Sequence, residues 1–226
     1  MAPVPPEGLR SPRDLAPYLD HTLLAPEATE ADVARLCAEA QAHRFAAVCV
    51  RACFAAQARA ALRDSAVHLA VVVDFPVGEA STAARVEEAR VAHLLGAQEL
   101  DLVVSRPRVH AGRWSEVLDD LTAVVRAVPI PVKVILETGA LDLDQLVAAA
   151  AVVRVSGAAY VKTSTGFGPG GATPEAVALL RAVVGQNVGV KASGGVRTAA
   201  QALAMIRAGA SRIGCSASVA IVEGTF

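Results

Sequence analysis

The chain has 226 residues, of which 54% are hydrophobic and 19% are charged, and its formal net charge is -1. This length and composition fit one large α/β domain with an ample core. A balanced charge without a basic cluster gives no support for binding nucleic acid or anionic membranes. No apolar run reaches the length of a membrane span.

The first residues, MAPVPPEGLR, lack the apolar stretch of a secretory signal peptide. We expect residues 1–10 to form a flexible lead-in and residues 11–226 to form a single catalytic domain. The sequence contains four cysteines but no C-x-x-C pair. We interpret them as reduced thiols of a cytoplasmic protein, because neither a disulfide framework nor a metal site is indicated.

Short apolar segments alternate with helical patterns along the whole chain. The segments read, in order, PYLDHTLL, AAVCV, HLAVVVDF, ELDLVV, VKVILE, AYVKTS, VGVKAS and RIGCS. Strict alternation of strands and helices is typical of parallel sheets with helical crossovers, and eight such units in this length predict a (β/α)8 TIM barrel. A doubly wound open sheet is the alternative, but no G-x-G-x-x-G turn follows the first segment.

Strand parity separates the charged residues from the apolar ones. Side chains alternate between the two faces of a strand, so Asp101 opposes its leucine neighbours and Lys162 opposes Val161. The same alternation puts Lys133 and Glu137 on the face opposite the apolar residues of their strand, and it does the same for Lys191 in the next strand but one. Four consecutive strands therefore direct ionisable groups to one side, which we predict to be the barrel interior.

Lys162 and Lys191 lie near the carboxyl ends of neighbouring strands, where barrel active sites form. Two ammonium groups at similar heights repel each other, which favours an uncharged amine on one of them. An uncharged lysine amine attacks carbonyl groups and forms an imine. Asp101 can balance the remaining positive charge and transfer protons. The pattern predicts a Schiff-base enzyme, but repulsion alone does not say which lysine loses its proton.

Glycine-rich loops follow the last three strands. Glycine lets backbone N–H groups approach an anion closely, and the loops after strands 7 and 8 are the usual phosphate site of a barrel. Tight turns alone would explain one such loop, whereas three on one rim favour a phosphate site. The residues predicted to bind phosphate or substrate are Thr165, Gly166, Gly194, Gly195, Gly214 and Ser216.

Six motifs in this order carry a family resemblance. They read LDHTLL, FPVGEAST, ELDLVV, KVILETG, YVKTSTGF and VKASGGVRT, and the match extends from about Tyr18 to Val222. This pattern resembles the deoxyribose-phosphate aldolases. The resemblance implies a cofactor-free class I aldolase that cleaves 2-deoxy-D-ribose 5-phosphate into D-glyceraldehyde 3-phosphate and acetaldehyde. It also implies a cytoplasmic enzyme of deoxynucleoside breakdown that forms a homo-oligomer of two or more subunits.

The resemblance assigns roles to the ionisable groups. Lys162 in VKTSTG is similar to the Schiff-base lysine of the family, and Lys191 in VKASGG is similar to the second lysine that tunes it. Asp101 in ELDLV is similar to the aspartate that relays protons. Two positions depart from the family pattern. Ala217 lacks a hydroxyl that many members carry, and the chain ends at Phe226 where some members have a tyrosine.

Four further residues are candidates to contact this group. Asp20 and Cys49 have inward parity, although packing is the simpler role for Cys49. Lys133 and Glu137 form either an ion pair that only stabilises the barrel or a part of the site. Two other functions stay open. A phosphate-binding barrel isomerase or synthase would not need two lysines at one depth, and a non-catalytic sugar-phosphate binding protein would not need all three ionisable groups.

Overall fold

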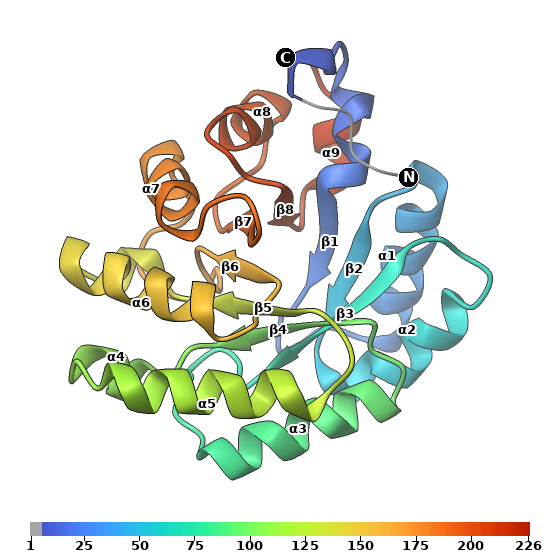
Figure 1. The fold of residues 1–226 in the computed structure, drawn as a ribbon. Helices are drawn as coiled ribbons and strands as arrows, with labels where there is room; N and C mark the ends of the chain where they lie inside the picture. Colours follow the sequence, from blue (N-terminus) through green and yellow to red (C-terminus); the bar gives the residue numbers. More distant parts are fainter. Residues whose placement is uncertain (1–5) are drawn as a thin grey trace.

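The computed structural model describes residues 6–226 and contains a closed barrel of eight parallel strands (Figure 1). Each strand pairs with the next along the chain, and β8 pairs with β1. The strands are β1 (Leu19–Leu23), β2 (Ala47–Val50), β3 (His68–Val73), β4 (Glu99–Val103), β5 (Val132–Ile135), β6 (Tyr160–Lys162), β7 (Gly189–Ser193) and β8 (Arg212–Cys215). The predicted (β/α)8 TIM barrel is therefore confirmed.

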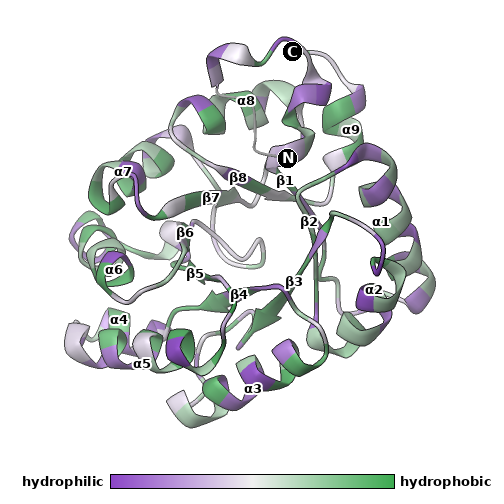
Figure 2. Ribbon diagram, turned by 45° about the vertical axis from the view of Figure 1, so that its right-hand side comes forward, coloured by the Kyte–Doolittle hydropathy of each residue, from purple (hydrophilic) through white to green (hydrophobic). Residues whose placement is uncertain are grey.

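Helices connect the strands and surround them as an outer ring (Figure 2). The α-helices are α1 (Glu30–His43), α2 (Ala55–Ala61), α3 (Thr82–Leu94), α4 (Arg106–His110), α5 (Trp114–Ala127), α6 (Leu143–Val155), α7 (Pro174–Val184), α8 (Ala199–Arg207) and α9 (Ser218–Glu223). Short 3-10 helices lie at Pro6–Gly8, Pro12–Tyr18, Ala52–Phe54 and Thr138–Ala140.

Side-chain caps fix where several helices begin. Thr29, Asp142 and Thr198 each accept a hydrogen bond from the backbone N–H three residues later, and the residue there returns a bond to the cap. Thr173 caps α7 with one such bond, accepted from the backbone N–H of Ala176, and Pro174 lies in the first turn. These caps satisfy N–H groups that the helix itself leaves without partners. The loops before α7 and α8 therefore end at defined points.

The first strand begins later than its apolar pattern predicts. Pro17 and Tyr18 belong to the 3-10 helix Pro12–Tyr18, because the fixed backbone of proline fits that turn and removes a donor from the sheet. Upstream of it, Leu9 is buried and joins the main hydrophobic core. Residues 1–5 lie outside the described residues, so the flexible lead-in and its boundary at residue 10 stay predictions.

The main core lies between the strands and the helices. Leu100, Leu102 and Val134 point outward from the barrel and are completely buried there. A second, smaller apolar cluster is separate from this core and consists of Leu24, Cys49, Ala70 and Val72. Because parity places Cys49 and Ala70 on the opposite face from the main core, the second cluster lines the barrel interior.

The outer layer contains one fully buried cation that the sequence pattern did not reveal. Arg85 of α3 donates from Nη1 to Asp120 Oδ2 of α5 at 2.6 Å and from Nη2 to the Val103 carbonyl of β4. Truncation of Arg85 would remove one of the cations that contact the buried carboxylate of Asp120. We expect Arg85→Ala to lower the free energy of unfolding by about 3–5 kcal/mol in urea denaturation. Arg90→Ala, on the exposed side of α3, should change it by less than about 0.5 kcal/mol, and equal losses would contradict this assignment.

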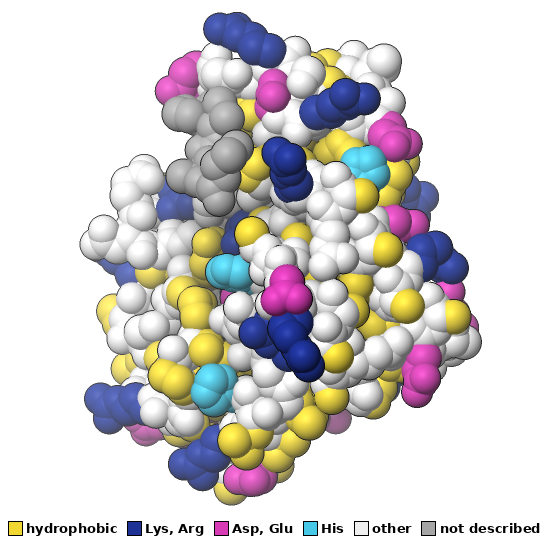
Figure 3. All heavy atoms as spheres, turned by 90° about the vertical axis from the view of Figure 1, so that its right-hand side faces the viewer, with side chains coloured by type: hydrophobic (Ala, Val, Ile, Leu, Met, Phe, Trp, Pro, Cys, Tyr) yellow, Lys and Arg dark blue, Asp and Glu magenta, His cyan; other side chains and the backbone are white. Residues whose placement is uncertain are grey.

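The surface carries charges of both signs. Figure 3 shows one face on which Arg side chains are interspersed with Asp and Glu and with small apolar areas; the three lysines of the chain are buried. Within residues 6–226, every helix is too short or too polar to cross a lipid bilayer.

Candidate active site

Strand register brings the predicted catalytic groups to matching heights inside the barrel. Lys162 of β6 pairs in register with Lys191 of β7, and Asp101 of β4 pairs with Lys133 of β5. All four side chains are buried, with at most 2% of their surface exposed. The parity argument for these residues is confirmed by the strand geometry.

Asp101 is the common partner of the three lysines. Its Oδ2 accepts from Lys162 Nζ at 2.7 Å and from Lys191 Nζ at 2.8 Å. Its Oδ1 accepts from Lys133 Nζ at 2.7 Å. Both carboxylate oxygens are therefore used, and hydrogen bonds to a buried carboxylate are strong.

The three lysines differ in the number of carboxylates that they contact. Lys191 Nζ also donates to Asp20 Oδ2 at 2.5 Å, and Lys133 Nζ lies 2.7 Å from Glu99 Oε2. Lys162 has Asp101 as its one carboxylate partner among the described residues. Within residues 6–226, these carboxylates do not form a group of three or more metal-ligating side chains that could hold an ion.

This difference separates the protonation equilibria of the lysines. Burial, helped by repulsion from Lys191, lowers the pKa of Lys162 despite its contact with Asp101. Burial would also lower the pKa of Lys191, but attraction to Asp101 and Asp20 outweighs it and raises the pKa. The pKa of Lys133 is raised in the same way, mainly by Asp101. Lys162 is therefore the lysine that most readily becomes an uncharged amine.

Asp101 responds in the opposite direction. Burial alone would raise the pKa of this carboxyl, but Lys133, Lys162 and Lys191 lower it well below its ordinary value. In the free protein Asp101 is thus a carboxylate that holds three amines in place. It becomes a better proton acceptor when one of those positive charges is lost.

Lys162 opens into a cavity of about 390 Å³ at the carboxyl ends of the strands. This volume suits a small metabolite. The cavity lining includes all six residues that were predicted to bind phosphate or substrate, which are Thr165, Gly166, Gly194, Gly195, Gly214 and Ser216. Arg197, which the sequence pattern did not single out, adds a guanidinium to the same lining.

Glycines shape this cavity for two different reasons. Gly194 and Gly195 have φ values of 88° and 81°, in the left-handed region that other residues rarely adopt. Successive residues of this kind can direct backbone N–H groups towards an anion. Gly214 instead makes room, because a Cβ there would lie 2.9 Å from Lys191 Cε. The strand-8 glycine therefore allows Lys191 to reach Asp101 and Asp20.

The two departures from the family pattern have visible consequences. Ser218, the next hydroxyl after Ala217, is buried and donates to the Cys215 carbonyl at 3.2 Å. Ser218 is not among the residues that line the cavity, so it does not replace the hydroxyl that Ala217 lacks. Phe226 has 46% of its surface exposed and is not among the residues that line the cavity.

The four further candidates occupy different positions. Asp20 contacts Lys191, and Lys133 contacts Asp101 and Glu99. Cys49 Sγ lies 3.9 Å from Asp101 Oδ2, and burial together with the Asp101 charge raises the pKa of its thiol to about 11. These three residues therefore line the charged interior.

The predicted ion pair between Lys133 and Glu137 is wrong, because the two side chains do not contact each other. β5 ends at Ile135, and Glu137 lies beyond it in a left-handed conformation with φ of 59°, so strand alternation no longer sets the direction of its side chain. Its Oε2 accepts from Thr165 Oγ1 at 2.5 Å and from Thr165 N at 3.2 Å. Glu137 thus holds the loop that follows Lys162.

Two functional neighbours were missed by the sequence argument. Glu99 and Arg212 are the first residues of β4 and β8, and both join the buried charge network. A signal was present, because Glu99 shares the inward parity of Asp101 two residues later. It was overlooked because residues at the amino end of a barrel strand lie away from the usual active site.

Comparison with known proteins agrees with this geometry. A family model described as DeoC/LacD family aldolase matches residues 15–223. A protein of Thermoanaerobacter sp. (strain X514) named deoxyribose-phosphate aldolase is 48% identical over 214 residues, which is 93% of this chain and 96% of that protein. A protein of the same name from Desulfitobacterium hafniense is 45% identical and covers 92% of this chain and 97% of its own.

Solved structures give the same answer for the fold. A crystal structure of a putative deoxyribose-phosphate aldolase from Coccidioides immitis has a TM-score of 0.92 and 41% identity, and the match covers 94% of this chain and 86% of that chain. The tetrameric deoxyribose phosphate aldolase from Aeropyrum pernix has a TM-score of 0.89 and 34% identity, covering 96% of this chain and 93% of its own. This chain therefore belongs to the DeoC/LacD family of aldolases.

Proposed function

We propose that this aldolase reversibly cleaves 2-deoxy-D-ribose 5-phosphate into D-glyceraldehyde 3-phosphate and acetaldehyde through a Schiff base on Lys162. One observation carries the proposal. Of the three lysines that contact Asp101, Lys162 has a single carboxylate partner, and it is the one that lines the glycine-rich cavity. The relatives named deoxyribose-phosphate aldolase support the choice of substrate.

The reaction begins with attack of the uncharged Lys162 amine on the C1 aldehyde of the open-chain sugar. Addition gives a carbinolamine, and loss of water gives an iminium ion. We assign to the ammonium of Lys191, which contacts Asp20 and Asp101, the donation of the proton that the departing hydroxyl needs. The new positive charge lies where Lys162 approached Asp101, so the carboxylate stabilises it.

Bond cleavage follows from the iminium ion. A base removes the proton of the C3 hydroxyl, the C2–C3 bond breaks, and its electron pair moves through C1 to the iminium nitrogen. Glyceraldehyde 3-phosphate leaves and an enamine stays on Lys162. We assign the proton transfer to Asp101 and Lys191, acting through a water molecule. Protonation of the enamine at C2 and hydrolysis of the imine release acetaldehyde and restore the amine.

The far end of the substrate is assigned to the glycine-rich loops. Gly194 and Gly195 offer backbone N–H groups, Ser216 offers a hydroxyl, and Arg197 offers a guanidinium on the same cavity wall. A phosphate bound there anchors C5 and holds C1 near Lys162. Binding energy from this remote group then serves the orientation of the reacting carbons.

Three broader properties belong to the same proposal. The chemistry uses side chains of this chain and needs no cofactor or metal. The protein acts in the cytoplasm, in the breakdown of deoxynucleosides. It forms a homo-oligomer of two or more subunits, and the tetramer described for the 34% identical aldolase of Aeropyrum pernix supports this.

Reductive trapping tests the proposal directly. Incubation with acetaldehyde and borohydride should reduce the imine to a stable N-ethyl group on Lys162, detected by peptide mass mapping. An adduct on Lys191 or Lys133 in its place, or no adduct, would reject the assignment of Lys162. Turnover of an isomerase substrate without an adduct would favour a barrel isomerase, and phosphate binding without turnover would favour a non-catalytic binding protein.

A further inference from the structure

The buried charge network continues beyond the lysines to the opposite mouth of the barrel. Arg212, the first residue of β8, donates from Nε to Asp20 Oδ1 at 2.7 Å and from Nη2 to Glu99 Oε2 at 2.8 Å. These are the same two carboxylates that contact Lys191 and Lys133. A continuous set of ion pairs therefore joins Arg212 to the amine of Lys162.

The charges in this network balance when Lys162 is uncharged. Three carboxylates face the barrel axis, on Asp20, Glu99 and Asp101. Three cations other than Lys162 contact them, on Lys133, Lys191 and Arg212. A buried site strongly disfavours an unpaired charge, so a balanced network resists a further proton.

We propose that Arg212 is a remote positioning residue that keeps Lys162 uncharged by supplying the third cation of this network. The inference rests on the proposed role of Lys162 in imine formation. If Arg212 were absent, three carboxylates would face two cations. Inside the barrel, the network amine that can supply the missing charge is Lys162, which would take up a proton and lose its nucleophilic lone pair.

The surroundings of both ends support this assignment. The titratable or charged groups close to Lys162 are Asp101 of β4, Lys191 of β7 and Cys49 of β2. Those facing Arg212 are Asp20 of β1, Glu99 of β4 and the Tyr160 ring of β6, whose centroid lies 5.9 Å from the guanidinium carbon. Glu99 also contacts His68 of β3, whose Nδ1 lies 2.9 Å from Glu99 Oε1.

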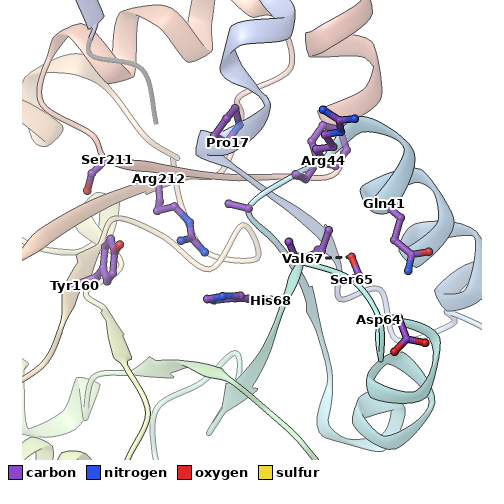
Figure 4. A pocket seen from close by; sticks show the side chains of 13 residues that line it. Pro17, Gln41, Arg44, Asp64, Ser65, Val67, His68, Tyr160, Ser211 and Arg212 are labelled. Atoms are coloured by element: carbon purple, nitrogen blue, oxygen red, sulfur yellow. Dashed lines mark hydrogen bonds between the residues drawn. The ribbon is translucent and has the colours of Figure 1, made fainter. Parts of the chain in front are cut away.

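A cavity of about 680 Å³ lies at this end of the barrel. Figure 4 shows the Arg212 guanidinium directed into it, between the rings of Tyr160 and His68. The Arg212 side chain has 12% of its surface exposed, so it forms part of the cavity wall. Substitution of Arg212 would therefore enlarge an existing space and would leave the packed outer core intact.

The test compares the pH dependence of imine formation in three proteins. The rate of borohydride trapping with acetaldehyde should rise with pH as the Lys162 amine loses its proton. Arg212→Met should move the midpoint of this rise up by about one pH unit, which lowers the rate about tenfold at pH values below the midpoint. Arg212→Lys keeps the charge, so its midpoint should stay with that of the unmodified chain even if its stability falls.

A compensating substitution separates charge from structural damage. Glu99→Gln combined with Arg212→Met leaves two carboxylates and two cations, so the midpoint should return towards its original value. Glu99→Gln alone leaves an excess of cations and should move the midpoint down. A purely structural role of Arg212 predicts no return, because the second substitution removes further contacts.

Each outcome decides between the two proposals. An unchanged midpoint in Arg212→Met, or no downward shift in Glu99→Gln, would overturn the role of Arg212 while leaving Lys162 as the imine former. The absence of any adduct in the unmodified chain would instead reject the proposed function. The Glu99→Gln arm applies even if Arg212→Met fails to fold.

Discussion

Lys162→Leu is expected to abolish cleavage, with a loss on the order of 10⁴-fold or more in turnover, because no imine can form. The fold should survive. Asp101 keeps its contacts with Lys133 and Lys191, and the apolar side chain removes an amine that is costly to bury. The release of glyceraldehyde 3-phosphate measures turnover, and urea denaturation should give a free energy of unfolding that is equal or higher.

Lys191→Leu provides the contrast. It removes a charged partner of Asp20 and Asp101, so the remaining network is short of one cation and Lys162 becomes protonated more readily. The N-ethyl adduct should still form on Lys162, but only at higher pH. Full turnover by Lys162→Leu, or an adduct that disappears at every pH in Lys191→Leu and persists in Lys162→Leu, would reverse the two assignments.

Asp101→Asn is expected to produce the largest loss of stability within the site. Three lysine amines would lose their common partner at a fully buried position. Removing one member of a buried ion pair typically costs about 3–5 kcal/mol. Urea denaturation at neutral pH should show a loss of this size or greater. Asp144→Asn, at an exposed position of α6, provides the matched control and should change the free energy of unfolding by less than about 0.5 kcal/mol.

The loss in Asp101→Asn should also depend on pH. Because the folded protein lowers the pKa of Asp101 well below the ordinary value of about 3.9, its stabilising contribution is fully present above that pH. The contribution disappears as the pH falls through the lowered pKa, since the carboxyl then binds a proton in the folded state too. The difference between the two proteins should shrink below about pH 4. A constant difference down to the acid transition would show that Asp101 does not act through its charge.

These expectations separate two roles that a lysine can have in the network. A lysine with two or more carboxylate partners is a fixed cation that holds the others in place. A lysine with one partner can exchange its proton and react. The geometry gives the second role to Lys162 and the first to Lys191 and Lys133. Catalytic identity here follows from the distribution of carboxylates, since all three amines are equally buried.

Much of this architecture was predictable from the sequence. The alternation of eight apolar segments with capped helices predicted the barrel, because period and capping are local properties of the chain. Parity predicted that Asp101, Lys133, Lys162 and Lys191 point inside, because side-chain alternation needs only the strand itself. Position along each strand predicted that the glycine-rich loops lie on the same rim as Lys162 and Lys191.

The tertiary structure distinguishes the two lysines by their carboxylate partners. Repulsion between Lys162 and Lys191 is symmetric, so the sequence left the choice between them to the family resemblance. Asp20, 171 residues away from Lys191 in the chain, breaks the symmetry by its 2.5 Å contact. The turn at Glu137 likewise depends on where β5 ends, and the link from Arg212 to Glu99 spans 113 residues. Such contacts arise from barrel closure and strand stagger, which no local pattern specifies.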